Sequence, residues 1–167
     1  MPDEKHEPAR FLNVDLVVDS LVSLDPLVTA LGARAMVLYH GKFSGHWRAV
    51  LELALPRGPD RAIKGFAKLL SALPVSAQNA WKRAKRRVFD IGIRGGNDPQ
   101  PLELVVSAEA ARQAAALGAS IQITVYAPVP VQGTRDRGPR DDRGLLRPSN
   151  EAVAGGRDPR LRSGSRR

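Results

Sequence analysis

The chain contains no cysteine among its 167 residues, which excludes disulfide bonds, thiolate metal ligands and thiol catalysis. Aromatic residues make up only 5% of the sequence, so a hydrophobic core has to be built mostly from aliphatic side chains. No apolar run approaches the roughly 18 residues that a membrane-spanning helix needs. Residues 1–8 are polar and acidic, unlike a secretory signal. We therefore expect a cytoplasmic protein without a membrane partner.

The composition predicts one folded domain with flexible ends. Hydrophobic residues make up 43% of the chain, close to the norm for globular domains. From residue 128 onward the sequence alternates Arg, Asp, Gly and Pro, and such a segment cannot bury enough apolar surface to offset its chain entropy. We predict a disordered N-terminus at residues 1–9, a single domain at residues 10–127 and a disordered, Arg-rich tail at residues 128–167.

Hydrophobic periodicity inside the domain predicts an α+β fold. Leu12, Val14, Leu16 and Val18 alternate with the residues between them, which is typical of a strand with one buried face. The same reasoning predicts strands at residues 11–18, 35–40, 47–55, 88–93, 102–106 and 121–126. The helical period predicts helices near residues 24–31, 60–73, 76–86 and 108–117. The order βαββααββαβ, with two hairpins, favours a largely antiparallel sheet with helices on one face.

Three stretches of this pattern carry a resemblance. They are residues 11–16 (FLNVDL), 88–93 (VFDIGI) and 117–126 (LGASIQITVY). Together they resemble small bacterial α+β domains of unknown function, some of which occur among proteins thought to confer immunity to toxins. The resemblance covers most of residues 10–127 and leaves the tail without a counterpart. It implies an α+β domain that binds a protein, and it implies no catalytic residues.

The net charge of +9 is unevenly distributed. Residues 10–127 carry +6, and residues 82–87 alone contribute +5. On two predicted helices, a candidate basic patch consists of Arg61, Lys64, Lys68, Lys82, Arg83, Lys85 and Arg86. Such a stripe could bind the phosphates of a nucleic acid. The alternative is an ordinary solvated helix surface, whose Lys and Arg stems shield apolar neighbours such as Trp81.

The polar side of the predicted sheet is a second candidate site. If the helices cover the side that bears Leu12 and Leu51, the opposite side presents Asn13, Asp15, Arg48, Glu52, Asp90, Glu103, Gln122, Thr124 and Tyr126. Four carboxylates stand there against one arginine, so this face leans acidic. It is either a solvated face, which is normal for an antiparallel sheet, or a docking surface for a basic partner.

Signals for chemistry are weak. His40 and His46 bracket the first predicted hairpin loop and could bind a metal with Glu52 as third ligand, or they could simply be exposed loop histidines. The glycine-rich residues 92–97 lack the Lys-Ser/Thr of a phosphate loop and precede a predicted strand, so we interpret them as a hairpin turn. The sequence carries no nucleophile–base motif and no paired-carboxylate loop. We therefore predict no catalytic residue, cofactor or metal.

These observations favour a non-catalytic, protein-binding domain, with an immunity-like role as one version of that hypothesis. Nucleic-acid binding through residues 82–87 and the Arg-rich tail is the alternative. An enzyme or a metal protein is a third possibility for which no motif argues. The sequence leaves the oligomeric state open.

Overall fold

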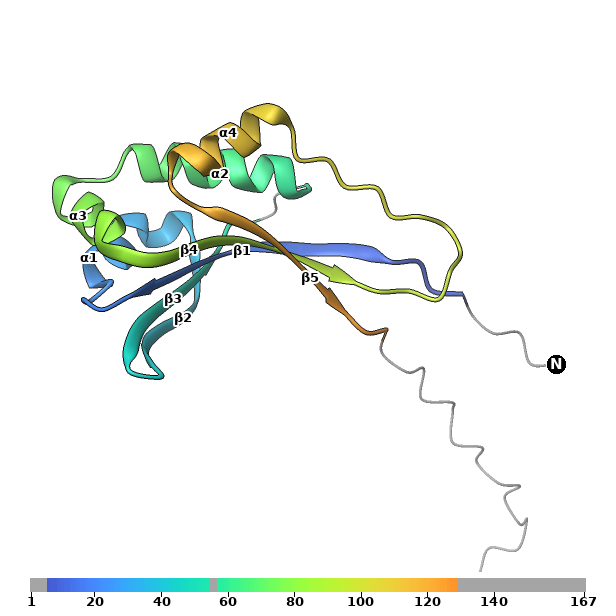
Figure 1. Cartoon of the computed structure of the whole chain (residues 1–167), viewed down its shortest axis with the longest axis horizontal. Coiled ribbons are helices and arrows are strands. Elements are labelled where there is room, and N and C mark those ends of the chain that lie inside the picture. The colour runs from blue at the N-terminus through green and yellow to red at the C-terminus, as the bar shows by residue number, and fades with distance from the viewer. Residues whose placement is uncertain (1–5, 55–56, 129–167) are drawn as a thin grey trace, which may run out of the picture. The chain divides into compact units, whose positions relative to one another are not determined.

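The computed structural model describes residues 6–54 and 57–128, all of which belong to one compact unit (Figure 1). Residues 1–5, the end of the predicted hairpin at Leu55, and the predicted tail from residue 129 onward lie outside the described residues. Within the described part of the chain the strands are β1 (Arg10–Ser20), β2 (Met36–Phe43), β3 (His46–Glu52), β4 (Ala84–Arg94) and β5 (Ser120–Tyr126). The helices are α1 (Asp25–Leu31), α2 (Pro59–Ser71), α3 (Val75–Arg83) and α4 (Ala108–Ala116), with a short 3-10 helix η1 (Gly32–Arg34) after α1.

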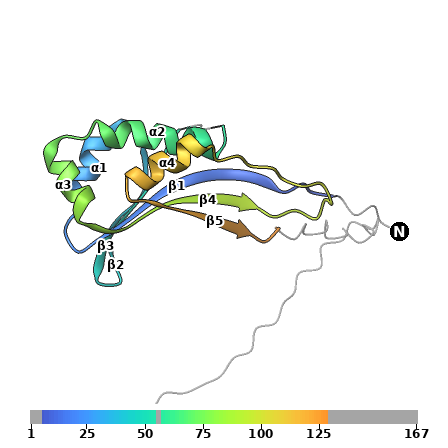
Figure 2. The same cartoon turned by 45° about the horizontal axis from the view of Figure 1, so that its top comes forward.

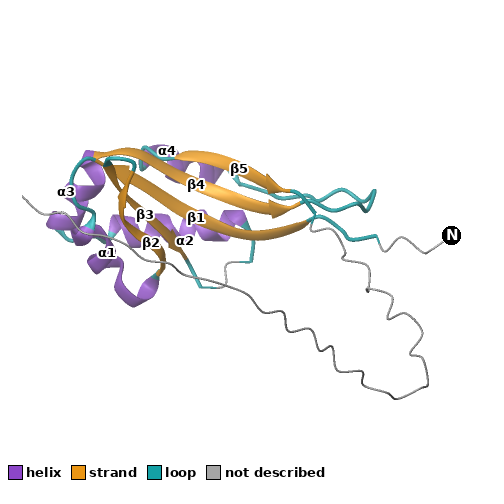
Figure 3. Ribbon diagram, turned by 90° about the horizontal axis from the view of Figure 1, so that it is seen from below, coloured by secondary structure: helices purple, strands orange, loops and turns teal. Residues whose placement is uncertain are grey.

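The strands form one sheet in the order β2-β3-β1-β4-β5. The pairs β2/β3, β3/β1 and β1/β4 are antiparallel, and β4/β5 is parallel. Figures 1 and 2 show the four helices of the described chain on one face of this sheet, and Figure 3 shows the other face, the open face, which no described helix covers. The predicted α+β class, with a largely antiparallel sheet and helices on one face, is confirmed.

The core lies between the helices and the inner face of the sheet, as amphipathic patterning requires. Helix α2 starts at a proline, where the missing N–H costs nothing, and buries Ile63 and Phe66 on one side. The Phe66 ring packs 5.9 Å from the Phe89 ring of β4. The β2/β3 turn places Ser44 and Gly45 at positive φ, a geometry that suits a two-residue hairpin turn. The first predicted hairpin therefore forms, with a shorter loop than expected.

The predicted strand at residues 102–106 is wrong, and so is the second predicted hairpin. Strand β4 pairs with β1 and β5 instead. The segment between β4 and α4 runs back beside the sheet without joining it (Figure 1). Leu104 and Val106 pack against the core, whereas Glu103 and Val105 are exposed. An extended segment buried on one side has the same period of two as a strand, so the pattern alone could not separate them.

The predicted helix at residues 76–86 ends early. Helix α3 stops at Arg83, because Ala84 has extended backbone angles (φ −63°, ψ 135°) and begins β4. Arg86 then pairs in register with Asp19 of β1. Residues that the helical period placed on one face are therefore divided between the end of a helix and the start of a strand.

The predicted inward orientation of Leu12 is also wrong. The pairing of β1 with β4 contains an irregularity between Phe11 and Asn13. One extra residue in a strand shifts the alternation of the residues beyond it. Phe11 therefore packs against the core, and Leu12 is 38% exposed.

Candidate partner-binding face

The open face of the sheet collects most of the polar residues that the sequence assigned to it. Asp15 in β1 lies opposite Glu52 in β3 and opposite Asp90 in β4. Gln122 lies opposite Asp90, and Thr124 lies opposite Gly92. Strand alternation puts Asn13, Arg48 and Tyr126 on the same side. The residues predicted for the partner face therefore lie together on one side of the sheet, with one exception.

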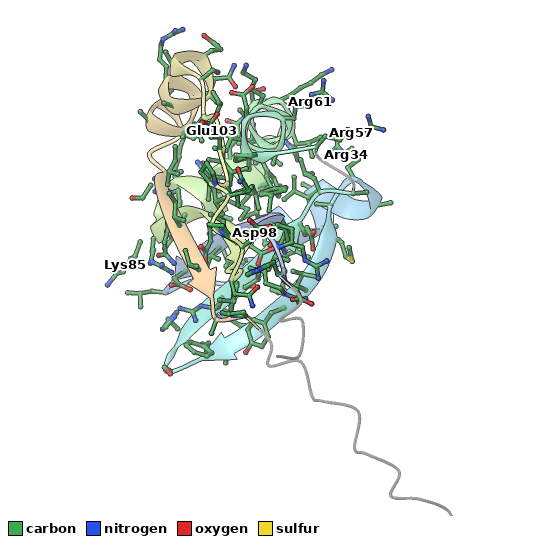
Figure 4. The ribbon with its side chains drawn as sticks, turned by 90° about the vertical axis from the view of Figure 1, so that its right-hand side faces the viewer. Arg34, Arg57, Arg61, Lys85, Asp98 and Glu103 are labelled. Carbon is green, nitrogen blue, oxygen red and sulfur yellow. The ribbon has the colours of Figure 1, made fainter. Side chains whose placement is uncertain are left out.

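Glu103 is the exception, because the segment that carries it is not a strand of the sheet. It is an exposed residue of the connection between β4 and α4. Figure 4 shows Glu103 near α4, away from the open face. Its assignment to the face depended on the predicted strand at residues 102–106 and falls with it.

Three acidic side chains form a row across the middle of the open face. This carboxylate row consists of Glu52, Asp15 and Asp90, on the neighbouring strands β3, β1 and β4. Partial burial, together with the charges of Glu52 and Asp90, raises the pKa of Asp15 to about 6. Like charges placed directly opposite each other on a sheet are unfavourable. The negative charges of the row therefore lower the free energy of unfolding of the domain.

Hydrogen bonds from neighbouring side chains orient two carboxylates of the row. Asn13 Nδ2 donates to Asp15 at 3.0 Å. Thr124 Oγ1 donates to Asp90 at 2.7 Å, and Gln122 Nε2 donates to Asp90 at 3.2 Å. The polar residues of β1 and β5 therefore hold the acids in place and supply no positive charge to balance them.

Arg48 does not balance the row either, because it is engaged by an acid that the sequence analysis missed. Its Nε and Nη2 donate to the two carboxylate oxygens of Asp19 at 2.6 and 2.9 Å. Asp19 is only 8% exposed, and its hydrogen bonds with Arg48 lower its pKa. His46 Nε2 lies 3.4 Å from Asp19, and Arg86 Nη1 lies 3.5 Å away. The only available signal was an acid near the end of an apolar strand, a position that usually requires a partner.

Positive and negative charges therefore occupy separate parts of the open face. The Asp19 cluster, with its arginines, occupies one end of β1. At the other end Arg10 lies opposite Arg94. The carboxylate row lies between these two basic zones, so the acidic character predicted for the whole face belongs to its middle.

The candidate basic patch is dispersed over three elements. Arg61, Lys64 and Lys68 lie on α2, where Lys64 Nζ pairs with Asp60 at 2.8 Å. Lys82 and Arg83 end α3, whereas Lys85 and Arg86 belong to β4. Arg86 turns to the open face, where it also donates to Gln122 at 3.1 Å. Figure 4 shows Lys85 pointing away from the body of the domain and Arg61 on the far side of it. Lys85 and Arg86 therefore do not continue the helix that carries Lys82 and Arg83, as the prediction required.

The two histidines considered as metal ligands lie on opposite faces of the β2/β3 hairpin. His40 is opposite the buried Ala49, on the helix side, and its Nε2 lies 3.2 Å from Asp25. His46 lies on the open side, near Asp19. In the described part of the chain no group of three or more His, Asp or Glu residues is placed to hold a metal ion. The geometry does not support the metal hypothesis.

The glycine-rich residues after β4 serve close packing. Gly95 N donates to the Tyr126 carbonyl at 2.7 Å. A side chain at Gly96 would start 2.2 Å from the Glu7 carbonyl oxygen, and Glu7 N donates to Asn97 Oδ1 at 2.6 Å. The interpretation as a hairpin turn is wrong, because the next element is helix α4 and not a strand. The glycines let this loop approach residues 7–9.

A hollow of about 580 Å³ opens among α2, α3 and α4, on the helix side of the domain. Its wall includes Leu70, Trp81 and Leu117. Arg87 also lines it, but the guanidinium donates to the carbonyls of Trp81 and Ala84 at 3.1 and 2.8 Å. Arg87 therefore caps the C-terminal end of α3, and its role is structural.

Comparison with known proteins identifies no relative: no family model, no curated protein and no solved structure matches the chain. Among the described residues, no helix has the length and apolar character needed to cross a membrane.

Proposed function

We propose that this chain is a non-catalytic protein-binding domain whose open sheet face docks a basic partner. The observation that carries the proposal is the position of Asp15 between Glu52 and Asp90 in register across three strands. Burial, and then the repulsion from Glu52 and Asp90, raises the pKa of Asp15, and a nearby cation stabilises such a carboxylate. A lysine or arginine placed over the row would relieve that repulsion.

Binding is favoured over acid–base chemistry by the setting of the row. A carboxyl group with a raised pKa beside ionised acids is also the arrangement of many catalytic sites. Such sites exclude water and enclose their substrate in a cleft. The carboxylate row instead lies on the face of the sheet opposite the four helices of the described chain (Figure 3). The three acids are half-buried on a sheet face that no described helix covers, a setting that suits contact with a macromolecular partner.

The resemblance to small bacterial domains suggests one specific version. A toxin that acts on nucleic acid has to present positive charge, and an acidic face could cover that surface. In this version the carboxylate row is the centre of an immunity-like interface. Nucleic-acid binding by this chain has less support, because the basic patch is split and Lys64 and Arg86 are paired with acids.

The test uses a synthetic oligolysine peptide as the basic probe and calorimetric titration of the full chain. We expect binding at pH 7.5 that weakens with salt, as for any charge-driven contact. Below about pH 6 binding should weaken further, because Asp15 becomes protonated. The triple variant Asp15→Asn, Glu52→Gln, Asp90→Asn should bind at least about tenfold more weakly, a loss of about 1.4 kcal/mol.

A matched control removes the same charge elsewhere. Asp98→Asn, Glu103→Gln and Glu109→Gln lie off the row, in the connection after β4 and on α4. This control should bind like the unaltered chain. Equal weakening in both triple variants would show that only net charge matters, and the proposed docking face would then be rejected.

A further inference from the structure

Strand β5 forms one border of the sheet (Figure 3). The Tyr126 carbonyl accepts from Gly95 N, so this residue directs its backbone groups toward β4. Successive residues of a strand direct their backbone groups to alternate sides. Ile121, Ile123 and Val125 therefore direct theirs outward. The border offers a row of backbone donors and acceptors to a further strand.

The side chains of the same three residues are unusually exposed for their type. On the helix side of the sheet, Ile121 is 38% exposed, and Ile123 and Val125 are each 63% exposed. Figure 1 shows why: β5 extends past the end of α4, so that helix covers only its beginning. Among the described residues, exposed apolar side chains and backbone groups without a neighbouring strand thus occur together on one edge.

Charge does not protect this edge. No Asp, Glu, Lys or Arg occurs between Arg112 and Arg135 in the sequence. Edge strands of soluble proteins are usually blocked by a charged residue, a proline or a bulge. The opposite edge, β2, has such protection: its pairing with β3 is irregular between Val37 and Tyr39, and it carries Lys42. The two edges are therefore unequal, although both expose apolar side chains.

The sequence of β5 is complementary to itself when it is reversed. With Ile123 placed opposite Ile123 of a second chain, Ile121 meets Val125 and Gln122 meets Thr124. Apolar side chains then meet apolar ones on one face, and polar side chains meet polar ones on the other. No like charges are brought together, because β5 contains no charged residue.

We propose that β5 pairs antiparallel with β5 of a second copy of this chain, around a two-fold axis at Ile123. Each outward-facing residue then exchanges backbone hydrogen bonds with its counterpart, as in any antiparallel ladder. The interface is the same patch on both copies, so it closes as a dimer. The two-fold axis is normal to the sheet, so both carboxylate rows face the same side.

Sedimentation equilibrium of the full chain over a range of concentrations tests this. We expect a dimer that dissociates on dilution. The variant Ile123→Lys places two ammonium groups opposite each other and should raise the dimer dissociation constant at least tenfold. Val105→Lys is the matched control, because Val105 is 72% exposed but lies outside the strands. It should leave the dissociation constant unchanged.

Charge-swapped chains keep the test independent of any folding defect. Ile123→Lys and Ile123→Glu should each be monomeric alone and should form a mixed dimer when combined. Dimerisation that survives both substitutions, or is lost on Leu38→Lys in β2, would overturn the proposal. A monomer at every soluble concentration would do the same. Assemblies that keep growing with concentration would also overturn the proposal, because they would indicate pairing of β2 with β5, which forms open chains and not closed dimers.

Discussion

Arg87 and Gly118, distant in sequence, are joined where β4 starts and α4 ends. Arg87 Nη1 donates to the Gly118 carbonyl at 3.3 Å, while Nη2 donates to Lys82 and Ala84 at 3.2 and 2.8 Å. The guanidinium also lies 5.4 Å from the Trp81 ring centre. One side chain thus satisfies carbonyls at the end of α3, which have no partner within the helix, and ties them to the turn before β5.

The backbone at Gly118 favours glycine, because its φ is +64°. A Cβ there would lie 2.6 Å from Arg87 Nη1, so the guanidinium would have to shift from its carbonyl partners. Gly118→Ala should therefore destabilise the domain by about 1–2 kcal/mol in urea unfolding. Arg87→Met, which keeps the stem, should cost about 1–2 kcal/mol because the part-buried carbonyls of Trp81 and Ala84 lose their donor. Arg83→Met, at the exposed last residue of α3, should change stability by less than about 0.5 kcal/mol. Equal effects of the two arginine substitutions would contradict this role.

The sequence predicted the parts of the fold that depend on local pattern. Helix α2 was predictable because its apolar residues recur at the helical period. The hairpin of β2 and β3 was predictable from alternation around a short polar loop. Asp15, Glu52 and Asp90 were placed on one face for the same reason, since period two assigns faces without knowledge of pairing.

Strand pairing could not be predicted in this way. That Asp15 meets both Glu52 and Asp90 follows from β1 lying between β3 and β4, an order set by tertiary packing. Leu104 and Glu103 alternate because of one-sided burial, and this resembled a strand. The end of α3 depends on Arg86 pairing with β1, a contact between residues far apart in sequence. Local pattern carries no information about such contacts.

Asp15 should make the stability of the domain depend on pH. Its pKa is raised from 3.8 to about 6 in the folded chain, so ionising it opposes folding. That opposition is absent below about pH 4 and complete above about pH 6. Asp15→Asn should therefore stabilise the domain at pH 7.5 by about 1 kcal/mol, after allowance for solvent screening, and have little effect at pH 4.

Urea unfolding at the two pH values measures this difference. Glu103→Gln is the control, because that exposed acid lies off the carboxylate row. It should leave stability unchanged at both pH values. If Asp15→Asn destabilises the chain equally at pH 4 and pH 7.5, the carboxylate row carries no electrostatic cost, and the main support for the docking face is lost.

The bond between Asp19 and Arg48 should show the opposite pH dependence. Arg48 lowers the pKa of Asp19 through two hydrogen bonds, so the stabilisation is present above the usual pKa of 3.8. It is lost as pH falls through the lowered pKa of the folded chain. Arg48→Met should destabilise the domain by about 3 kcal/mol at pH 7, because a buried carboxylate loses its main partner.

Arg48→Lys should recover only part of that loss, since an ammonium group cannot donate two parallel hydrogen bonds to one carboxylate. The matched control is Arg112→Met, which removes an exposed ion pair with Glu109 on α4 and should cost less than about 0.5 kcal/mol. In a double-mutant cycle, Asp19→Asn with Arg48→Met should give a coupling energy above about 1 kcal/mol at pH 7. That coupling should shrink in acid as Asp19 takes up a proton. A coupling near zero at pH 7 would mean that Asp19 is held by His46 and Arg86 instead, the two other groups within reach of its carboxylate.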